Sequence, residues 1–524
     1  MLKWRVLILA AGAALLLIYS HLITFVPDGI TYGVIEAARN LAEGRGLVTQ
    51  AGPAAFVPYY RNPTPPFPYL WYPLVPIVTS GLFRLFGVQP KLVVVFPMAM
   101  YLLSGIAVFE LGRRLFSPVT GVLAALAVLV QPFMLETAAR ENFTDPVLVA
   151  LVVSAVGCVF MASADGTRQP LRWLTASGVL LGLSQYARSA ATALYLPMLL
   201  LVALLAPRRR AAWAGVFLLA CLVTQVPLFV WNVRHIGRLA FTPGYVFVSQ
   251  TPSFPAQSAL VSVLPPDFPI FSQHGREVLL KWIGQLWVHY KYFFTMTSPL
   301  LLVGAMLFGA KPVPPRPRVL WIFTVALYLT IATLNSLYIW DNRYLLPVVP
   351  FVAILGVEFI RGTLGVAPLP PSVRTWAAVV IALFVVVDPA DFFYQLVKSR
   401  PLFPLIQRDA SEREAFMKAN LRAGDVVMAS DAPLIAWETR NVALGLPLSP
   451  AKATLLNDRY VRFNTLVLET RRPRSDLYGF AEDWFQIARG EKTYRDFRIE
   501  GSGVLSTGQR LVLLRSGSNE STTR

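Results

Sequence analysis

The chain has 524 residues, of which 55% are hydrophobic and only 15% are charged. Soluble domains of ordinary composition carry about 25% charged residues, so the composition argues against a soluble protein. A net charge of +18 would suggest a nucleic-acid partner if the chain were soluble. Here the basic residues lie in short gaps between apolar runs, as they do in the cytoplasmic loops of membrane proteins. We therefore expect membrane topology to account for the charge, and we expect no nucleic acid.

The opening sequence MLKWRVLILAAGAALLLIYS predicts a first span with its N-terminus in the cytoplasm. Lys3 and Arg5 precede an apolar segment that is too long for a signal peptide and has no clean cleavage pattern. A bilayer core needs about 20 apolar residues per helix, and many later runs meet that length. We predict an α-helical polytopic membrane protein with about eleven spans, at residues 6–26, 92–112, 119–135, 146–163, 172–187, 190–206, 212–231, 292–310, 319–340, 344–360 and 375–390.

The basic loops agree with this arrangement. Alternation from a cytoplasmic N-terminus places every strongly basic short loop on the inner side, as the positive-inside rule requires. These loops carry Arg113 with Arg114, Arg168 with Arg172, Arg208 to Arg210, Lys311 with Arg316 and Arg318, and Arg361 with Arg374.

Residues 69–87 are apolar enough to span, but counting them would reverse the parity of every later loop. The segment contains Pro73 and Pro76 and follows the proline-rich stretch RNPTPPFP. We expect an interfacial or half-inserted helix on the outer side. The alternative is that it spans and that the protein has 12 or 13 spans.

Two long regions, 27–91 and 232–291, are expected outside. After Asp391 the composition becomes mixed polar and charged. The runs DVVMAS, NTLVLET and QRLVLLRS predict strands, and a helix is expected after the break at Pro433. We divide the chain into a membrane domain, 1–391, and a small extracytoplasmic α/β domain, 392–524.

Four arginines lie at predicted outer ends of spans, where the topology rule disfavours them. They are Arg140, Arg188, Arg234 and Arg343. Arginine is the preferred residue for bidentate recognition of phosphate, so four such groups could converge on one anionic ligand. The alternative for each is a side chain that snorkels to the lipid headgroups.

Two acidic residues also lie at membrane boundaries. Asp28 follows the first span in FVPDGITYG, and Asp145 opens a span in ARENFTDPVL. A partly desolvated carboxylate at such a boundary can act as a general base. On spacing alone the simpler interpretations are structural: a turn residue for Asp28 and a helix N-cap followed by proline for Asp145.

Five stretches, in order, carry a resemblance to a known family. They are PDGITYGVIEAARNLAEGRGL, ARENFTDPVLVA, GLSQYARSAATALYLP, VPLFVWNVRHIGRLAFTPGY and DNRYLLPVVPFVAIL. The chain resembles GT-C glycosyltransferases that use polyprenyl-phosphate sugars, and it is most similar in pattern to protein O-mannosyltransferases and lipid A aminoarabinose transferases. Many members have an acidic pair in the first loop, whereas here Gly29 follows Asp28. The stretch RNPTPPFPYLWYP also lacks the Glu or His that would bind a metal in some members, so we expect neither a metal nor another cofactor.

The resemblance implies an inverting transfer of a sugar from a polyprenyl-phosphate carrier to an acceptor hydroxyl. It implies a plasma (inner) membrane location, with catalysis on the extracytoplasmic face and a lipid, glycan or protein as acceptor. A base must take the acceptor proton and cations must stabilise the leaving phosphate. We assign the base to Asp28, orientation of the acceptor or of an arginine to Asp145, and pocket-lining roles to Tyr32 and Tyr344. Phosphate contacts are assigned to Arg140, Arg188, Arg234 and Arg343.

The rival hypothesis is a transporter or flippase for a lipid-linked or anionic solute, which would use the same arginines. Transporters usually contain internal repeats and broken helices near the membrane midplane. The sequence has no clear repeat, and the unusual charges gather at one predicted face. An enzyme is therefore the favoured interpretation.

Overall fold

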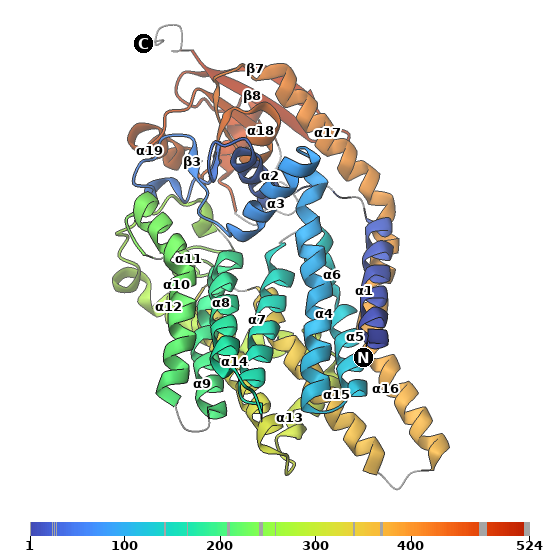
Figure 1. Ribbon diagram of the computed structural model, residues 1–524. Coiled ribbons are helices and arrows are strands. Elements are labelled where there is room, and N and C mark those ends of the chain that lie inside the picture. The colour runs from blue at the N-terminus through green and yellow to red at the C-terminus, as the bar shows by residue number, and fades with distance from the viewer. Residues whose placement is uncertain are drawn as a thin grey trace.

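The computed structural model describes residues 2–517, apart from 24, 26, 28, 141–142, 165, 207–209, 240–244, 257, 339–340, 367–369 and 471–478. A bundle of helices carries a mixed sheet at one end (Figure 1). The chain begins in the bundle, far from the sheet, and most strands of the sheet come from its last residues.

Serine and proline begin several bundle helices, as at Ser117, whose side chain accepts a hydrogen bond from the Thr120 amide while Pro118 opens the helix. Glycine allows close crossings, because a side chain at Gly178 would overlap the backbone carbonyl of Phe217. The bundle helices are α1 (Leu2–Leu22), α4 (Val95–Leu115), α5 (Pro118–Leu129), α6 (Pro132–Ala139), α7 (Thr144–Ala162), α8 (Pro170–Ala187), α9 (Tyr195–Leu205), α10 (Arg210–Ile236), α13 (Pro299–Phe308), α14 (Pro315–Leu337), α15 (Val349–Val366) and α16 (Pro371–Ser399).

The protein is a multi-pass membrane protein. Among the described residues six helices are long and apolar enough to cross a membrane, or seven if α5 and α6, which meet at a bend of 60°, form one span. Shorter apolar helices add to the bundle, among them residues 189–205 and α13. Each predicted span overlaps a helix or two consecutive helices. The bounds of the segment 292–310 were wrong, because the chain breaks there between Met296 and Pro299.

The region 232–291 is not simply a loop. It contains the short α11 (Tyr245–Val248), the 3-10 turn η4 (Ser258–Val261) and most of α12 (Ile270–Met296), a helix of 27 residues. Lys281 fastens α12 to its neighbours. Its ammonium group donates to the carbonyls of Phe247 (2.7 Å), Ser249 (2.9 Å) and Tyr338 (2.9 Å). Because Lys281 and other polar side chains lower the hydropathy of α12, a search for apolar runs does not find this helix.

The first outer region, 27–91, forms a compact cap. It contains α2 (Gly29–Ala42), β1 (Val48–Thr49), β2 (Ala51–Gly52), η1 (Val57–Tyr59), β3 (Phe67–Pro68) and α3 (Leu74–Phe86), and η2 (Pro90–Val94) leads into α4. Helix α3 has 13 residues, so it is about 20 Å long and too short to cross a hydrocarbon core of about 30 Å by itself. It packs beside α2 above the bundle (Figure 1).

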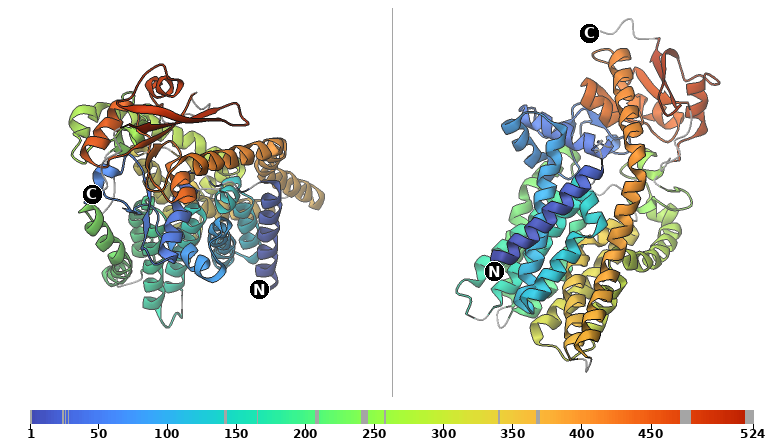
Figure 2. Two further views of the ribbon diagram at one scale, coloured as in Figure 1. Left: turned by 90° about the horizontal axis from the view of Figure 1, so that it is seen from above. Right: turned by 90° about the vertical axis from the view of Figure 1, so that its right-hand side faces the viewer.

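The C-terminal region is α/β, as predicted. A six-stranded sheet has the order β2-β5-β4-β6-β8-β7. Strands β2, β5, β4 and β6 are parallel to one another, and β8 is antiparallel to both of its neighbours, β6 and β7. Figure 2 shows α16 and α17 as a long column that runs from the bundle to the sheet. Helix α16 continues through the predicted domain boundary at 391/392 and ends at Ser399. The elements are η6 (Arg400–Leu402), α17 (Phe403–Asn420), β4 (Val426–Ala429), α18 (Ala432–Thr439), β5 (Val442–Gly445), α19 (Pro450–Arg459), β6 (Thr465–Glu469), α20 (Glu482–Arg489), β7 (Phe497–Val504) and β8 (Arg510–Ser516).

One strand of this sheet comes from the other end of the chain. Strand β2, in the first outer region, pairs in parallel with β5, with Ala51 opposite Ala443 and Gly52 opposite Leu444. The first outer region and the C-terminal region therefore share a sheet.

Candidate active site

A buried ion pair joins the ends of α7 and α8. Arg188 directly follows α8, and Asp145 is the second residue of α7. Their side chains form an ion pair in which Arg188 is 5% and Asp145 1% exposed. Charged groups are buried at this depth only when they are paired. Among the described residues, Arg188 Nε and Asp145 Oδ2 have no hydrogen-bond partner, so the pair retains unused donor and acceptor capacity.

Two tyrosines surround the guanidinium group of Arg188. Its central carbon lies 4.4 Å from the ring centroid of Tyr344 and 6.0 Å from that of Tyr72. Tyr344 belongs to η5 (Asn342–Val348), which leads into α15, and Tyr72 belongs to the first outer region. The aromatic faces attract the cation and hold its plane. Elements from three distant parts of the sequence thus meet at Arg188.

Arg343 lies next to Tyr344 in the sequence and forms an ion pair with Asp341. Its Nε lies 3.0 Å from Asp341 Oδ1 and 2.9 Å from Oδ2, and its backbone amide also donates to Oδ1. Burial alone would raise the pKa of Asp341, but the hydrogen bonds and charge of Arg343, together with the charge of Arg188, lower it. The Arg343 side chain is 22% exposed. An anionic ligand could therefore reach it. Asp145, Arg188, Asp341, Arg343, Tyr344 and Tyr72 are called the arginine cluster below.

The other two predicted arginines lie outside this cluster. Arg140 ends α6 and pairs with Glu136 of the same helix at 3.3 Å, with its side chain 37% exposed. Arg234 is exposed in the last turn of α10. The expected convergence of four arginines is thus reduced to Arg188 and Arg343, and Arg140 and Arg234 fit the alternative of side chains that reach the headgroups.

Two further predicted site residues are Asp28 and Tyr32. Asp28 lies outside the described residues. Tyr32, in the first turns of α2, packs against the same buried apolar cluster as Trp437. Burial, with the nearby charges of Glu438 and Glu414, raises its pKa. These charges belong to the C-terminal region, so Tyr32 lies near it. The pocket-lining role of Tyr32 stays a prediction.

Asp145 is not the N-cap of its helix. The N-cap position of α7 is Phe143, which makes no side-chain cap, and Asp145 lies within the helix. The carboxylate instead supplies the counter-charge that buried Arg188 requires.

Sequence reasoning missed Asp341 and Tyr72. Asp341 stands two residues before Arg343 in DNRYLLP, and an acid so close to a suspect arginine was an available signal. Tyr72 had none, because it reaches Arg188 only through the folding of the first outer region over the bundle.

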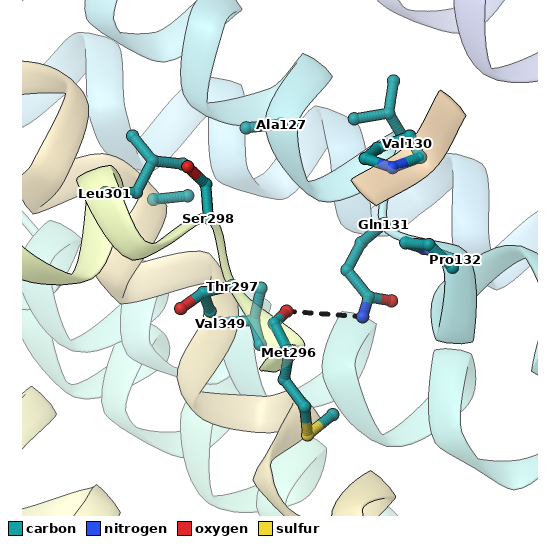
Figure 3. A pocket seen from close by; sticks show the side chains of 11 residues that line it. Ala127, Val130, Gln131, Pro132, Met296, Thr297, Ser298, Leu301 and Val349 are labelled. Carbon is teal, nitrogen blue, oxygen red and sulfur yellow. Dashed lines mark hydrogen bonds between the residues drawn. The ribbon is translucent and has the colours of Figure 1, made fainter. Parts of the chain in front are cut away.

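A small pocket lies elsewhere, where two helix breaks face each other (Figure 3). It is between the α5–α6 bend and the α12–α13 break, where Gln131 Nε2 donates to the Met296 carbonyl at 3.4 Å. Its volume of about 40 Å³ would hold a few water molecules. The lining, which includes Thr297 and Ser298, carries no charged side chain. No predicted site residue lines this pocket.

Within the described part of the chain, no group of three or more His, Cys, Asp and Glu side chains could hold a metal ion. Independence from metals stays a prediction.

Comparison with known proteins identifies the fold. A family model for dolichyl-phosphate-mannose-protein mannosyltransferase matches residues 66–231, from the first outer region to α10. The solved structure of ArnT from Cupriavidus metallidurans bound to undecaprenyl phosphate is similar over 98% of both chains, with 15% identity and a TM-score of 0.56. The chain has the GT-C fold.

A second GT-C protein supports the assignment. The archaeal oligosaccharyltransferase AglB from Archaeoglobus fulgidus, in complex with an inhibitory peptide and a dolichol-phosphate, is 14% identical with a TM-score of 0.54. The match covers 96% of this chain and 74% of AglB. A search by sequence among curated proteins gives no match. The GT-C fold that the sequence resemblance implied is confirmed. At these identities the likeness establishes the fold, and the chemistry must be argued from the residues.

Proposed function

We propose that the protein is an inverting glycosyltransferase that moves a sugar from a polyprenyl-phosphate carrier to an acceptor hydroxyl. The observation that carries this proposal is the arginine cluster. It brings together two guanidinium groups, one buried and one partly exposed, near the end of α8, the start of α7 and η5, and in contact with Tyr72 of the first outer region. The phosphate of a lipid whose chain lies in the bilayer would meet the protein at this depth.

The cluster suits a leaving phosphate. Arg188 is held by Asp145 and Tyr344 before any ligand binds, so it needs little reorganisation when negative charge develops. Arg343 can exchange part of its contact with Asp341 for a phosphate oxygen. The proposal draws support from two GT-C proteins, because ArnT was solved with undecaprenyl phosphate and AglB with a dolichol-phosphate.

The acceptor hydroxyl needs a base, because an alcohol is a weak nucleophile until its proton is removed. We assign this role to Asp28, which directly precedes α2 in the sequence. Phosphate leaves without a general acid. A single displacement, with the base on the face opposite the leaving group, inverts the anomeric centre.

The broken helices also bear on the rival hypothesis of a transporter, because discontinuous helices near the midplane form substrate sites in transporters. The pocket at these breaks is lined without a charged side chain. An anionic solute would find no counter-charge there, whereas the charges gather at the arginine cluster. This distribution favours the enzyme.

The function can be tested with purified protein in lipid, a panel of radiolabelled polyprenyl-phosphate sugars and a crude envelope fraction as acceptor. We expect label to move from one donor to a lipid, glycan or protein. Transfer should persist in EDTA. Loss of transfer in chelator that one divalent metal restores would contradict the metal-free mechanism, and no transfer from any donor would contradict the function.

We also propose that the sheet and the arginine cluster lie on the extracytoplasmic face of the plasma membrane. A cysteine at Arg210, which begins α10, and another at Ala451, in α19, should then react with an impermeant thiol reagent from opposite sides in intact cells. Both positions are exposed. Each cysteine should be introduced into a background without Cys158 and Cys221. Labelling of both from outside would rule out this topology.

Arg343→Ala should weaken donor binding. A charge-assisted hydrogen bond contributes about 1.5–3 kcal/mol, so we expect the donor Kd to rise about 10- to 100-fold. Turnover should fall as well, because phosphate is charged in both the ground and the transition state. Arg361→Ala is the matched control, since Arg361 is exposed in α15 and pairs with Glu358 of the same helix. Unchanged donor affinity in Arg343→Ala would leave Arg343 as a snorkelling side chain.

A further inference from the structure

Helix α2 buries polar side chains on the face that meets the C-terminal region. Glu36, Arg39 and Asn40 are at most 6% exposed, although α2 lies in the first outer region, where charged groups could remain in water. Burying such groups costs free energy unless each finds a partner. The partners of this face therefore indicate what the face is for.

Arg39 spans the gap to the C-terminal region. Its guanidinium carbon lies 4.3 Å from the ring centroid of Trp437, and its Nη1 donates to the Trp437 carbonyl at 2.8 Å. Nη2 donates to the Ala436 carbonyl at 3.4 Å. Both carbonyls belong to the last turns of α18, where backbone acceptors lack partners within the helix and a cation is favoured. Arg39 thus ties α2 to α18 by stacking and by hydrogen bonds.

Glu36 and Asn40 attach the same helix to β1 and to the residue between β1 and β2. The Glu36 carboxylate accepts hydrogen bonds from the Thr49 hydroxyl and from the Gln50 amide, the latter at 2.6 Å. The Gln50 carbonyl in turn accepts from the Ala443 amide at the start of β5. Asn40 donates to the Val48 carbonyl at 2.8 Å. Helix α2 is therefore fixed to α18 directly by Arg39, and to β5 indirectly through Glu36 and Gln50.

We propose that Arg39 is a positioning residue for the transfer reaction. By locking α2 to α18, Arg39 holds the helix whose first residue, Gly29, directly follows Asp28 in the sequence. The C-terminal region is then part of the catalytic unit, although no residue of it needs to touch the substrate. This inference rests on the proposed function, and specifically on Asp28 as the base.

The test compares Arg39→Met with wild type in the full-length protein in lipid. Methionine keeps an apolar stem of similar length and removes the charge and both hydrogen bonds. A small displacement of a reacting group can cost about 10²-fold in rate, so we expect kcat to fall about 10- to 100-fold. Donor Kd should stay at the wild-type value, because the arginine cluster is untouched. Arg39→Lys, which keeps the charge, should recover part of the rate.

Glu43→Gln is the matched control at the same interface. Glu43 pairs with Arg440 across it at 3.1 Å, but the two side chains are 31% and 56% exposed, so the loss of this pair should leave kcat unchanged. Should Arg39→Met fail to fold, Arg39→Lys carries the test: folded protein with wild-type kcat would overturn the proposal. So would a fall in donor affinity that matches the fall in kcat, because that is the signature of a general loss of structure.

A double variant separates this proposal from the proposed function. If Arg39 acts through Asp28, then Asp28→Asn with Arg39→Met should be no slower than Asp28→Asn alone. A further tenfold loss in the double variant would overturn the positioning role. Normal turnover in Asp28→Asn would instead remove the base assignment, whereas a slow Asp28→Asn beside a normal Arg39→Met would overturn only the role of Arg39.

Discussion

Asp28→Asn should lower kcat about 10²–10⁴-fold, the contribution expected of general base catalysis. Asparagine is nearly isosteric with aspartate but cannot accept the acceptor proton, so the fold and the donor site should survive. Donor Kd, measured by competition with unlabelled polyprenyl phosphate, should stay close to wild type. The variant therefore binds donor and fails to transfer it.

A matched control is Asp267→Asn, because Asp267 is an exposed carboxylate in the other outer region, 232–291. It should turn over normally. Near-normal kcat in Asp28→Asn would remove Asp28 from the mechanism. Loss of donor binding in step with kcat would also count against a base, since a base acts on the acceptor.

Arg188→Met should destabilise the protein and abolish tight donor binding. It leaves Asp145 as an unpaired buried charge, and breaking a buried pair costs about 3–5 kcal/mol. Replacing both members, with Asp145→Leu and Arg188→Met together, should restore most of the stability, because an apolar pair of similar volume is often as stable as the ion pair. Donor affinity should not return, because the phosphate ligand is still missing.

These two properties can be measured separately, stability by thermal unfolding in detergent and affinity by donor competition. The double variant is decisive because it keeps the fold and lacks the cation. If it bound donor as tightly as wild type, the Arg188–Asp145 pair would be a structural feature alone.

The bundle could be predicted from the sequence because apolar length and basic loops are local signals. Each predicted span overlaps helical structure. The error at 292–310 has a physical cause. Helix α12 carries Lys281 and other polar groups that find partners only in the folded protein, so its hydropathy resembled that of a loop and the real helix boundary was hidden.

The sheet shows a different limit. Strands around Val426, Leu466 and Leu513 were readable as apolar runs, and the C-terminal α/β region was predicted from them. Strand β2 has two residues and no pattern of its own. It becomes a strand only because β5 offers it a free edge, so the union of the first outer region with the C-terminal region could not be foreseen.

The candidate site could be predicted only in part from the sequence. Position at the end of a span marked Arg188 and Arg343 as unusual, and it marked Arg140 and Arg234 equally. Burial separates them: Arg188 is sealed by Asp145 and Tyr344, whereas Arg234 is exposed. Pairing across more than 40 residues leaves no trace in local spacing, which is why Asp145 resembled a helix cap.

The most direct test of the proposed function measures two products in one reaction in proteoliposomes: sugar on the acceptor and free polyprenyl phosphate. A glycosyltransferase should release one polyprenyl phosphate for each sugar transferred, and Asp28→Asn should lose both products together. Movement of intact donor across the bilayer, with its sugar still attached and no polyprenyl phosphate released, would contradict the enzyme and establish the transporter.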